Sequence, residues 1–272
     1  MTDRYAVIGH PVAHSRSPEI HAAFARECGQ DIEYDRLLAP LNGFVATAES
    51  FRRSGASGAN VTVPFKLEAF NYANERTARA QRGRSVNTLR FENDNVLGDN
   101  TDGVGLCRDI VDNLGQALQG ANILLVGAGG AARGVVGALL DCAPESLAIT
   151  NRTHAKAADI VDELDAGIVF RALELSVLPS RSFDVVINAT SASLTAGLPQ
   201  VPAACFGTNA LAYDMMYGKG LTPFLALAAS AGARTADGVG MLVEQAAEAF
   251  YVWRGVRPST APVIELLKSS AL

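Results

Sequence analysis

The chain has 272 residues, 49% hydrophobic and 19% charged, which is a composition typical of a globular protein long enough for two domains. A net charge of -5, with no cluster of basic residues interleaved with aromatic ones, argues against a nucleic acid partner. The four cysteines form no Cys-x-x-Cys pair and the N-terminal apolar run is too short for a secretion signal, so we expect a cytoplasmic protein with no disulfide framework, metal or membrane partner.

The first hundred residues predict alternating strands and helices. "YAVIG" at 5–9 is a short apolar strand, and in the helix that follows Ser17 is a candidate N-cap with Pro18 at the first helical position. Further elements are expected as a strand, a helix and a strand at 31–39, 41–55 and 58–63. "SVNTLRF" and "NVLGDN" predict a hairpin across the turn "ENDN". We expect residues 1–101 to form an α/β domain.

From Asp102 onward the pattern predicts a second domain, at residues 102–237. Its expected strands lie in 121–127, 146–151, 167–170, 183–190 and 210–217, with helices before and between them. Strands separated by helices at this spacing indicate a parallel sheet, so the fold class is α/β. Residues 238–272 differ because they predict two helices with no strand between them. We expect these C-terminal helices to return to the first domain.

A glycine-rich turn follows the first strand of the second domain. "LLVGAGGAAR" has the spacing G-x-G-x-x-A at Gly127, Gly129 and Ala132, directly after an apolar strand and at the start of a helix. Glycines in this position allow backbone N–H groups to approach a pyrophosphate at the positive end of the helix. The alternative is a purely structural turn, but the strand and helix on either side favour a dinucleotide site.

The end of the next strand indicates which dinucleotide is bound. NAD sites usually place an acidic residue there, whereas this strand ends in Asn151-Arg152-Thr153, with Lys156 close behind. Two cations and no carboxylate fit the 2′-phosphate of NADP. The alternative is a solvated basic helix start, which is disfavoured because cations are unfavourable at a helix N-terminus without an anion.

In the first domain, polar residues gather at the ends of predicted elements. Alternation in "NVTVPFK" places Asn60 and Thr62 on one strand face, and Lys66 follows the proline that ends the strand. An edge strand followed by a solvated lysine is the alternative. The other polar residues at element ends are Ser15, Ser17, Asn87 and Asp102. Such a set suits a small polyhydroxylated ligand. Ser15 and Ser17 flank the start of a helix and could bind a carboxylate of this ligand; the alternative is that they only cap the helix.

Through nine motifs taken together, the chain resembles the shikimate dehydrogenase family. They are "AHSRSP", "NVTVPFK", "SVNTL", "DNTDG", "GAGGAAR", "NRT", "NATSAS", "YDMMY" and "GMLVEQA", in this order along nearly the whole chain. The resemblance implies an α/β substrate domain, a Rossmann NADP domain and C-terminal helices that pack on the first domain. It also implies reversible NADP-dependent oxidation of shikimate to 3-dehydroshikimate, a step of chorismate and aromatic amino acid biosynthesis.

The resemblance also implies roles for individual residues. Lys66 and Asp102 would be the catalytic pair, in which Lys66 takes up or returns the hydroxyl proton while Asp102 holds it in place. The substrate would be bound by Ser15, Ser17, Asn60, Thr62, Asn87, Tyr217 and Gln245. The cofactor would be bound by Gly127, Ala128, Gly129, Gly130, Ala131, Asn151, Arg152, Thr153, Lys156, Asn188, Thr190, Ser191, Gly238 and Met241.

Some of these residues have simpler interpretations. Gln245 interrupts an apolar helix stripe and so needs a polar partner, unless it lies at a boundary position, and Tyr217 could be a packing residue. Two other functions compete: a broader quinate/shikimate dehydrogenase often using NAD, and a ligand-binding regulator without turnover. Arg152 and Lys156 disfavour the broader dehydrogenase that uses NAD, and the intact Lys66 and Asp102 disfavour the regulator. We expect a monomer or a homodimer.

Overall fold

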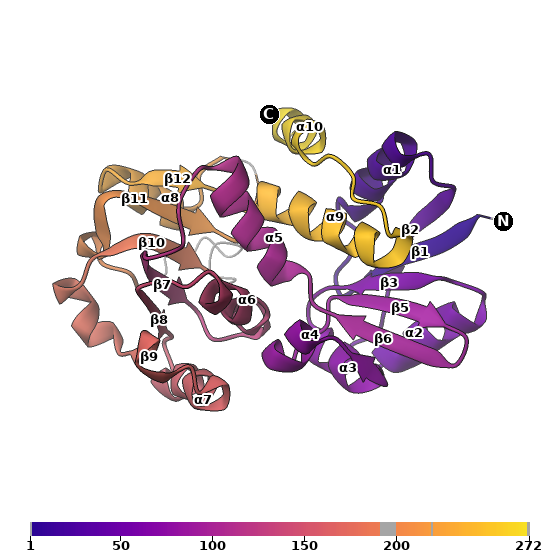
Figure 1. Ribbon diagram of the computed structural model, residues 1–272, viewed down its shortest axis with the longest axis horizontal. Coiled ribbons are helices and arrows are strands. Elements are labelled where there is room, and N and C mark those ends of the chain that lie inside the picture. The colour runs from indigo at the N-terminus through magenta and orange to yellow at the C-terminus, as the bar shows by residue number, and fades with distance from the viewer. Residues whose placement is uncertain (1, 191–199, 219, 271–272) are drawn as a thin grey trace. The chain divides into compact units, whose positions relative to one another are not determined.

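A computed structural model describes residues 2–190, 200–218 and 220–270 of the chain. The chain divides into two compact units, each with its own sheet (Figure 1). Unit 1 comprises Met1–Gly105 and Leu242–Leu266, and unit 2 comprises Leu106–Met241 and Leu267–Leu272. Unit 1 is therefore assembled from two stretches of sequence that are far apart in the chain.

Unit 1 is built on a six-stranded mixed sheet in the order β2-β1-β3-β5-β6-β4. The strands are β1 (Asp3–Gly9), β2 (Ile32–Leu38), β3 (Gly58–Val61), β4 (Glu75–Arg76), β5 (Thr88–Glu92) and β6 (Asn95–Asp99). β1 pairs in parallel with both β2 and β3, whereas β5 and β6 form the expected antiparallel hairpin. Because the strand order reverses between β1 and β3, the carboxyl ends of these two strands lie at the position where α/β sheets typically bind ligands.

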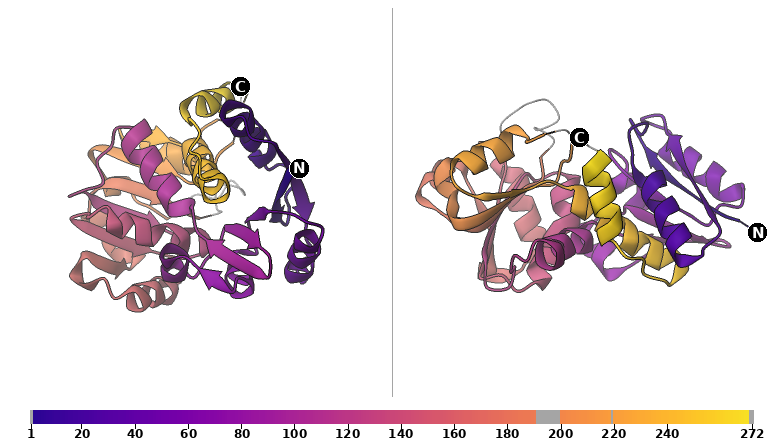
Figure 2. Two further views of the ribbon diagram at one scale, coloured as in Figure 1. Left: turned by 45° about the vertical axis from the view of Figure 1, so that its right-hand side comes forward. Right: turned by 90° about the horizontal axis from the view of Figure 1, so that it is seen from above.

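Helices cover both faces of this sheet. They are α1 (Ser17–Cys28), α2 (Phe44–Arg53), α3 (Lys66–Tyr72) and α4 (Ala78–Gly83), joined by parts of α9 (Val239–Arg254) and α10 (Ala261–Ser270). Side chains alternate along β1, so Ala6 and Ile8 join the core that contains Phe44 of α2. Tyr5 points to the other face, where α1 and α9 lie (Figures 1 and 2), and stacks on Trp253 of α9, with the ring centroids 4.5 Å apart.

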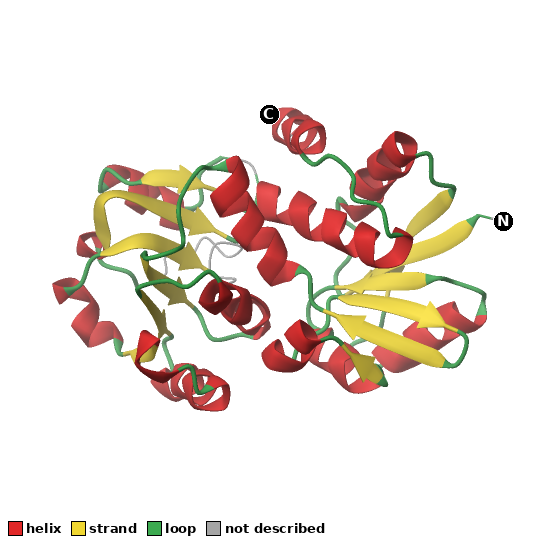
Figure 3. Cartoon of the chain, viewed as in Figure 1, coloured by secondary structure: helices red, strands yellow, loops and turns green. Residues whose placement is uncertain are grey.

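Unit 2 has a six-stranded sheet in which every strand pair is parallel, in the order β12-β11-β10-β7-β8-β9. The strands are β7 (Asn122–Val126), β8 (Ser146–Thr150), β9 (Phe170–Leu173), β10 (Phe183–Asn188), β11 (Phe206–Asp214) and β12 (Arg234–Ala236). The helices are α5 (Asp102–Arg108), which begins in unit 1, then α6 (Gly130–Asp141), α7 (His154–Leu164) and α8 (Pro223–Ser230). Strands and helices alternate along this unit (Figure 3), and the strand order is that of a Rossmann fold.

The structure confirms the predicted fold class, a two-domain α/β protein with a Rossmann unit. Three local predictions were wrong or incomplete. Helix α1 begins at Ser17 itself, after Arg16, so Ser17 does not cap it. Residues 167–169 form a 3₁₀ turn, and the strand runs from Phe170 to Leu173. The short elements β4, α3, α4 and β12 escaped prediction because they span too few residues to establish a period.

Within the described ranges, no helix combines the length and the apolarity that crossing a membrane would require.

Candidate active site

Lys66 and Asp102 form an ion pair in unit 1. Lys66 is the first residue of α3, after the turn that follows β3, and Asp102 is the first residue of α5, after β6. The Lys66 Nζ lies 2.6 Å from Asp102 Oδ2, and the two side chains are only 18% and 7% exposed. An acidic residue in the first turn of a helix is favoured by the helix dipole. The lysine is therefore not the solvated residue of the simpler interpretation.

The second carboxylate oxygen of Asp102 is held by Asn87. Asn87 Nδ2 lies 2.8 Å from Asp102 Oδ1 and 3.3 Å from Gln245 Oε1 of α9, and Asn87 Oδ1 accepts from the Thr101 amide at 2.9 Å. Asn87 is 2% exposed, so its amide is oriented by these partners. The apolar stripe of α9 is thus interrupted by Gln245 at the point where the helix meets the polar cluster, as the need for a polar partner predicts.

Asn60 lies next to this cluster, and both ends of its side-chain amide are hydrogen-bonded to other protein groups. Its Oδ1 accepts from Tyr34 Oη at 2.7 Å, and its Nδ2 donates to Asn87 O and Thr88 Oγ1, each at 3.2 Å. Burial raises the pKa of Tyr34, so the phenol remains a donor at neutral pH. Asn60 therefore orients its neighbours, and the half-buried Thr62, just past the end of β3, is more accessible.

The two serines meet where β1 gives way to α1. Ser15 Oγ donates to Ser17 Oγ at 3.1 Å, and the Ser17 amide donates to Ser15 Oγ at 3.3 Å. Arg36 fixes the loop by donating to the Ser15 carbonyl from Nε at 2.8 Å and from Nη2 at 2.5 Å. Because no side chain caps α1, hydroxyls and helix N-terminus together offer donors that suit a carboxylate. β1 and β3 are adjacent and parallel, so the serines share a sheet edge with Thr62 and Lys66.

The glycine-rich turn of unit 2 connects β7 to α6. Gly127 has φ of +111°, and a Cβ there would lie 3.0 Å from Thr190 Cγ2, so the turn requires a glycine. Gly129 is the residue before α6 and provides no side-chain cap, and a Cβ on Gly129 or Gly130 would point into open space. The neighbouring Ala128 and Ala131 have only a methyl side chain. The turn therefore leaves the helix N-terminus accessible to a pyrophosphate.

The predicted 2′-phosphate site follows β8, the strand that pairs with β7. Asn151 Nδ2 donates to the Thr153 carbonyl at 2.9 Å, and Thr153 is the residue before α7. Arg152 and Lys156 are both exposed, and neither makes an ion pair with another described residue. Two free cations beside the glycine-rich turn fit the phosphate of NADP.

The other predicted cofactor residues lie around the ends of β10 and β11. Asn188 is fully buried, and its Oδ1 accepts from Thr190 Oγ1 at 2.7 Å while its Nδ2 donates to Asp214 Oδ1 at 3.1 Å, so it orders the backbone beside Gly127. Gly238 packs on the Met215 carbonyl. The amide of Met241 donates to Tyr213 Oη at 3.3 Å, and Tyr217, predicted to bind substrate, is half-buried. Ser191 lies outside the described residues. The roles of these residues remain predictions.

Besides Thr88 and Thr101, four residues that support the cluster escaped sequence analysis. They are Tyr34, Arg79, Asp99 and Glu248, all in unit 1. Tyr34 bonds to Asn60, and Arg79 forms ion pairs with Asp99 and Glu248. Asp99 begins "DNTDG", three residues before Asp102, and this position was the local signal that could have indicated it.

A Rossmann unit with exposed basic residues after its second strand, together with a unit that holds a buried lysine–carboxylate pair among hydrogen-bonding side chains, is typical of a two-domain NADP-dependent oxidoreductase. Three family models match: the shikimate dehydrogenase substrate binding domain at residues 7–89, shikimate / quinate 5-dehydrogenase at 109–196, and the shikimate 5′-dehydrogenase C-terminal domain at 238–268. The chain belongs to the shikimate dehydrogenase family.

Individual relatives agree with this assignment. The chain is 56% identical over 271 residues to the shikimate dehydrogenase (NADP(+)) of Nitrosospira multiformis, covering 99% of this chain and 98% of the relative. It resembles the crystal structure of an Ael1 enzyme from Pseudomonas putida, with a TM-score of 0.94, 52% identity and 98% of each chain covered. It also resembles shikimate 5-dehydrogenase of Thermus thermophilus in complex with NADP(H) and shikimate, with a TM-score of 0.88, 32% identity and both chains fully covered.

Proposed function

We propose that this protein catalyses the reversible NADP-dependent oxidation of shikimate to 3-dehydroshikimate, a step of chorismate and aromatic amino acid biosynthesis. The observation that carries the proposal is the 2.6 Å contact between Lys66 Nζ and Asp102 Oδ2, at a sheet edge rich in hydrogen-bonding groups. An ion pair of this kind can move one proton to or from a bound alcohol. The relative from Thermus thermophilus, whose structure is described as a complex with NADP(H) and shikimate, supports the choice of substrate.

The acid–base step belongs to Lys66. When a hydride leaves a secondary alcohol carbon, the hydroxyl proton must leave as well: Lys66 takes it up in its neutral amine form, and its ammonium form returns the proton in the reverse direction. Asp102 holds Lys66 through Oδ2, while Asn87 holds Asp102 through Oδ1. The two residues act as one coupled pair. Bound NADP supplies the hydride acceptor.

Substrate recognition is divided between residues that follow β1 and residues near the ends of β3 and β5 and on α9. Ser15, Ser17 and the start of α1 bind the carboxylate, since they offer hydroxyl and backbone donors together. Thr62, Asn87 and Gln245 bind ring hydroxyls or hold the acid–base pair. Asn60 acts mainly on its neighbours, because Tyr34, Asn87 and Thr88 engage its amide.

We also propose that NADP is preferred over NAD, that the protein is cytoplasmic, and that it is a monomer or homodimer without a nucleic acid partner. Exposed Arg152 and Lys156 support the cofactor preference, as Arg binds phosphate through a planar fork of donors. Four free cysteines support a reducing compartment.

The experiment is an assay of the purified protein with shikimate and with quinate, each against NADP and NAD. We expect reduction of NADP with shikimate, and weaker or no activity in the other three combinations. Comparable rates with quinate and NAD would establish the broader dehydrogenase instead. Failure to reduce either cofactor with either substrate would refute the enzyme function.

A further inference from the structure

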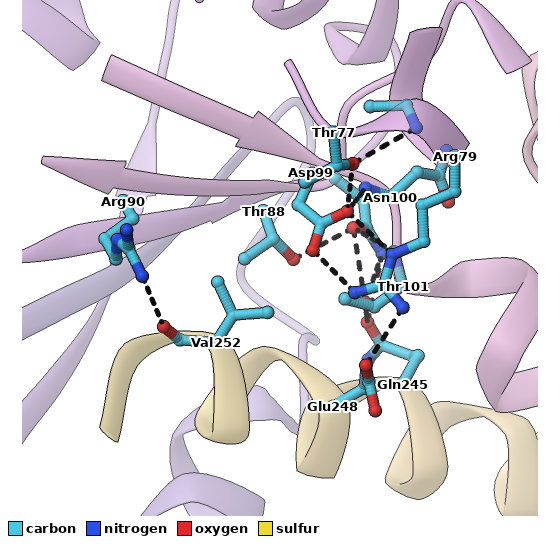
Figure 4. Close-up of polar contacts among 12 residues, drawn as sticks. Thr77, Arg79, Thr88, Arg90, Asp99, Asn100, Thr101, Gln245, Glu248 and Val252 are labelled. Carbon is cyan, nitrogen blue, oxygen red and sulfur yellow. Dashed lines mark hydrogen bonds and ion pairs between the residues drawn. The ribbon is translucent and has the colours of Figure 1, made fainter. Parts of the chain in front are cut away.

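One guanidinium in unit 1 binds two carboxylates from distant parts of the chain (Figure 4). Arg79 of α4 donates to Asp99 at the end of β6, with Nε 2.7 Å from Oδ1 and Nη2 2.5 Å from Oδ2. Its Nη1 donates to Oε1 of Glu248 on α9 at 2.9 Å. Arg79 thus joins α4, the end of β6 and α9, through a bidentate bond to Asp99 and a single bond to Glu248.

This cluster is partly buried and electrically balanced. The side chains of Asp99 and Glu248 are 3% and 8% exposed, and Arg79 is 33% exposed. Arg257 Nη2 donates to the other oxygen of Glu248 at 2.6 Å, so two cations face two carboxylates. Burial opposes the charged form of Arg79, but bonds to Asp99 and Glu248 outweigh it and raise the pKa of Arg79 above its ordinary value. The guanidinium is therefore permanently charged.

The bonds of Asp99 lead directly to Asp102. Asp99 Oδ1 accepts from the Asn100 amide at 2.7 Å, and the Asn100 side chain donates to the Ser85 carbonyl at 2.9 Å. Asn100 Oδ1 in turn accepts from the Asp102 amide at 3.0 Å. Consequently the loop 99–102 is fixed at its first residue by Arg79, and at its last by the side chain of Asn100.

The bond to Glu248 leads to a second part of the candidate active site. Glu248 lies three residues after Gln245, so the two side chains project from the same face of α9. Gln245 Oε1 accepts from Asn87 Nδ2 at 3.3 Å, and the same Nδ2 contacts Asp102. Arg79 therefore restrains both elements that meet at Asn87.

We propose that Arg79 is a positioning residue for the Lys66–Asp102 pair. Arg79 connects the loop 99–102 to α9. This connection fixes the position of Gln245 and the direction from which Asp102 holds Lys66. Arg79 acts through Asp99 and Glu248 and needs no contact with the substrate. The inference rests on the proposed function, because it assigns a role within that reaction.

The test compares Arg79 variants with a matched control, Arg90→Gln. Arg90 of β5 also links the sheet to α9, by donating from Nη1 to the Val252 carbonyl at 3.2 Å, but it does not touch the loop 99–102. Arg79→Gln removes the charge and the fork of donors, whereas Arg79→Lys retains the charge and loses the fork. Steady-state shikimate oxidation gives kcat and both KM values, and thermal unfolding checks that each variant is folded.

We expect kcat of Arg79→Gln to fall roughly tenfold or more, since misplaced acid–base groups lose transition-state contacts, with KM for NADP within about twofold of wild type. Arg79→Lys should recover only part of kcat, and Arg90→Gln should keep wild-type kcat. Leaving two buried carboxylates without Arg79 could unfold Arg79→Gln. In that case the kcat of Arg79→Lys tests the inference. Glu248→Gln leaves the bond between Arg79 and Asp99 in place, so this variant should mainly raise KM for shikimate.

Two results would overturn the inference. If every folded Arg79 variant kept kcat within about twofold of wild type, the cluster would be only structural. If Arg90→Gln lost as much kcat as Arg79→Lys, the effect would come from attachment of α9 in general. A wild-type protein inactive with shikimate would instead refute the proposed function, and that result is visible before any variant is compared.

Discussion

Gly105 of α5 packs directly against Gln245 of α9, so that a Cβ on Gly105 would lie 2.7 Å from both the backbone nitrogen and the Cβ of Gln245. The two helices approach this closely only because residue 105 has no side chain. The position of Gln245 therefore depends on a glycine as well as on the hydrogen bonds of its amide.

Gly105→Ala should displace the part of α9 that carries Gln245. Because overpacking typically costs about 1–3 kcal/mol, we expect a lower melting temperature and a KM for shikimate raised by several-fold. KM for NADP should change little, because the predicted cofactor residues around the glycine-rich turn belong to unit 2. Thermal unfolding and steady-state kinetics measure both effects, and an unchanged KM for shikimate would show that Gln245 does not bind substrate.

Lys66→Ala should abolish most turnover without abolishing binding. Proton transfer by a positioned group contributes about 10² to 10⁴-fold, so kcat should fall by that order while calorimetry still detects NADP and shikimate. Asp102→Asn should cost no more than Lys66→Ala, and the double variant little more than the worse single one, because the pair acts as a unit. Near-wild-type kcat in Lys66→Ala at saturating substrate would contradict the assigned role.

Arg152→Ala should weaken NADP more than NAD, because only NADP carries the 2′-phosphate. Loss of a charge-assisted hydrogen bond costs about 1.5–3 kcal/mol, which corresponds to a rise in KM for NADP of roughly tenfold or more. Arg171→Ala is the matched control, since Arg171 is an exposed cation on β9 of the same unit. Equal losses with both cofactors would show that Arg152 does not read the phosphate.

Joint replacement of Ser15 and Ser17 by alanine should raise KM for shikimate and leave KM for NADP nearly unchanged. The hydroxyls would contact a carboxylate that does not react, so they stabilise ground and transition states alike, and kcat should fall less than kcat/KM. A shikimate analogue without the carboxylate provides the control. If the missing carboxylate lowers kcat/KM by the same factor in the wild type and in the double variant, Ser15 and Ser17 do not bind the carboxylate.

His21 should make the folded state sensitive to acid. It is fully buried between aromatic rings, stacks on Tyr34 at 4.4 Å, and has no hydrogen-bond partner for either ring nitrogen among the described residues. Burial lowers the pKa of His21 from 6.5 to about 3. Because the unfolded chain binds the proton more readily, this contribution to stability is complete above pH 6.5 and is lost as the pH falls toward 3, by about 1.4 kcal/mol per pH unit.

Urea unfolding between pH 7 and pH 4 measures this effect. We expect His21→Phe to flatten the acid limb of the stability curve, since phenylalanine keeps the stacking and has no proton to bind. His14→Gln is the control, because His14 is exposed, and its acid limb should match that of wild type. An acid limb in His21→Phe as steep as that of wild type would refute the assignment.

Local patterns were enough to predict the elements that carry the chemistry. Gly127 and Gly129 follow a strand and precede a helix, and Lys66 follows a strand and a proline, so neighbouring residues alone placed them. Arg79 and Tyr34 could not be found in this way. Arg79 is 20 residues from Asp99 and 169 from Glu248, and Tyr34 is 26 from Asn60, so only the folded chain shows which partners they meet.

The discontinuity of unit 1 has a consequence for the order of folding. Gln245, Glu248 and Trp253 belong to a stretch that is synthesised after all but the last residues of unit 2. While the chain emerges from the ribosome, unit 2 has the sequence for its whole sheet before unit 1 has received the helix that covers Tyr5 and supports Asn87. Because long-range contacts form slowly and domains tend to fold as units, we expect the sheet of unit 2 to form first, and the acid–base pair to be ordered only after α9 has been synthesised.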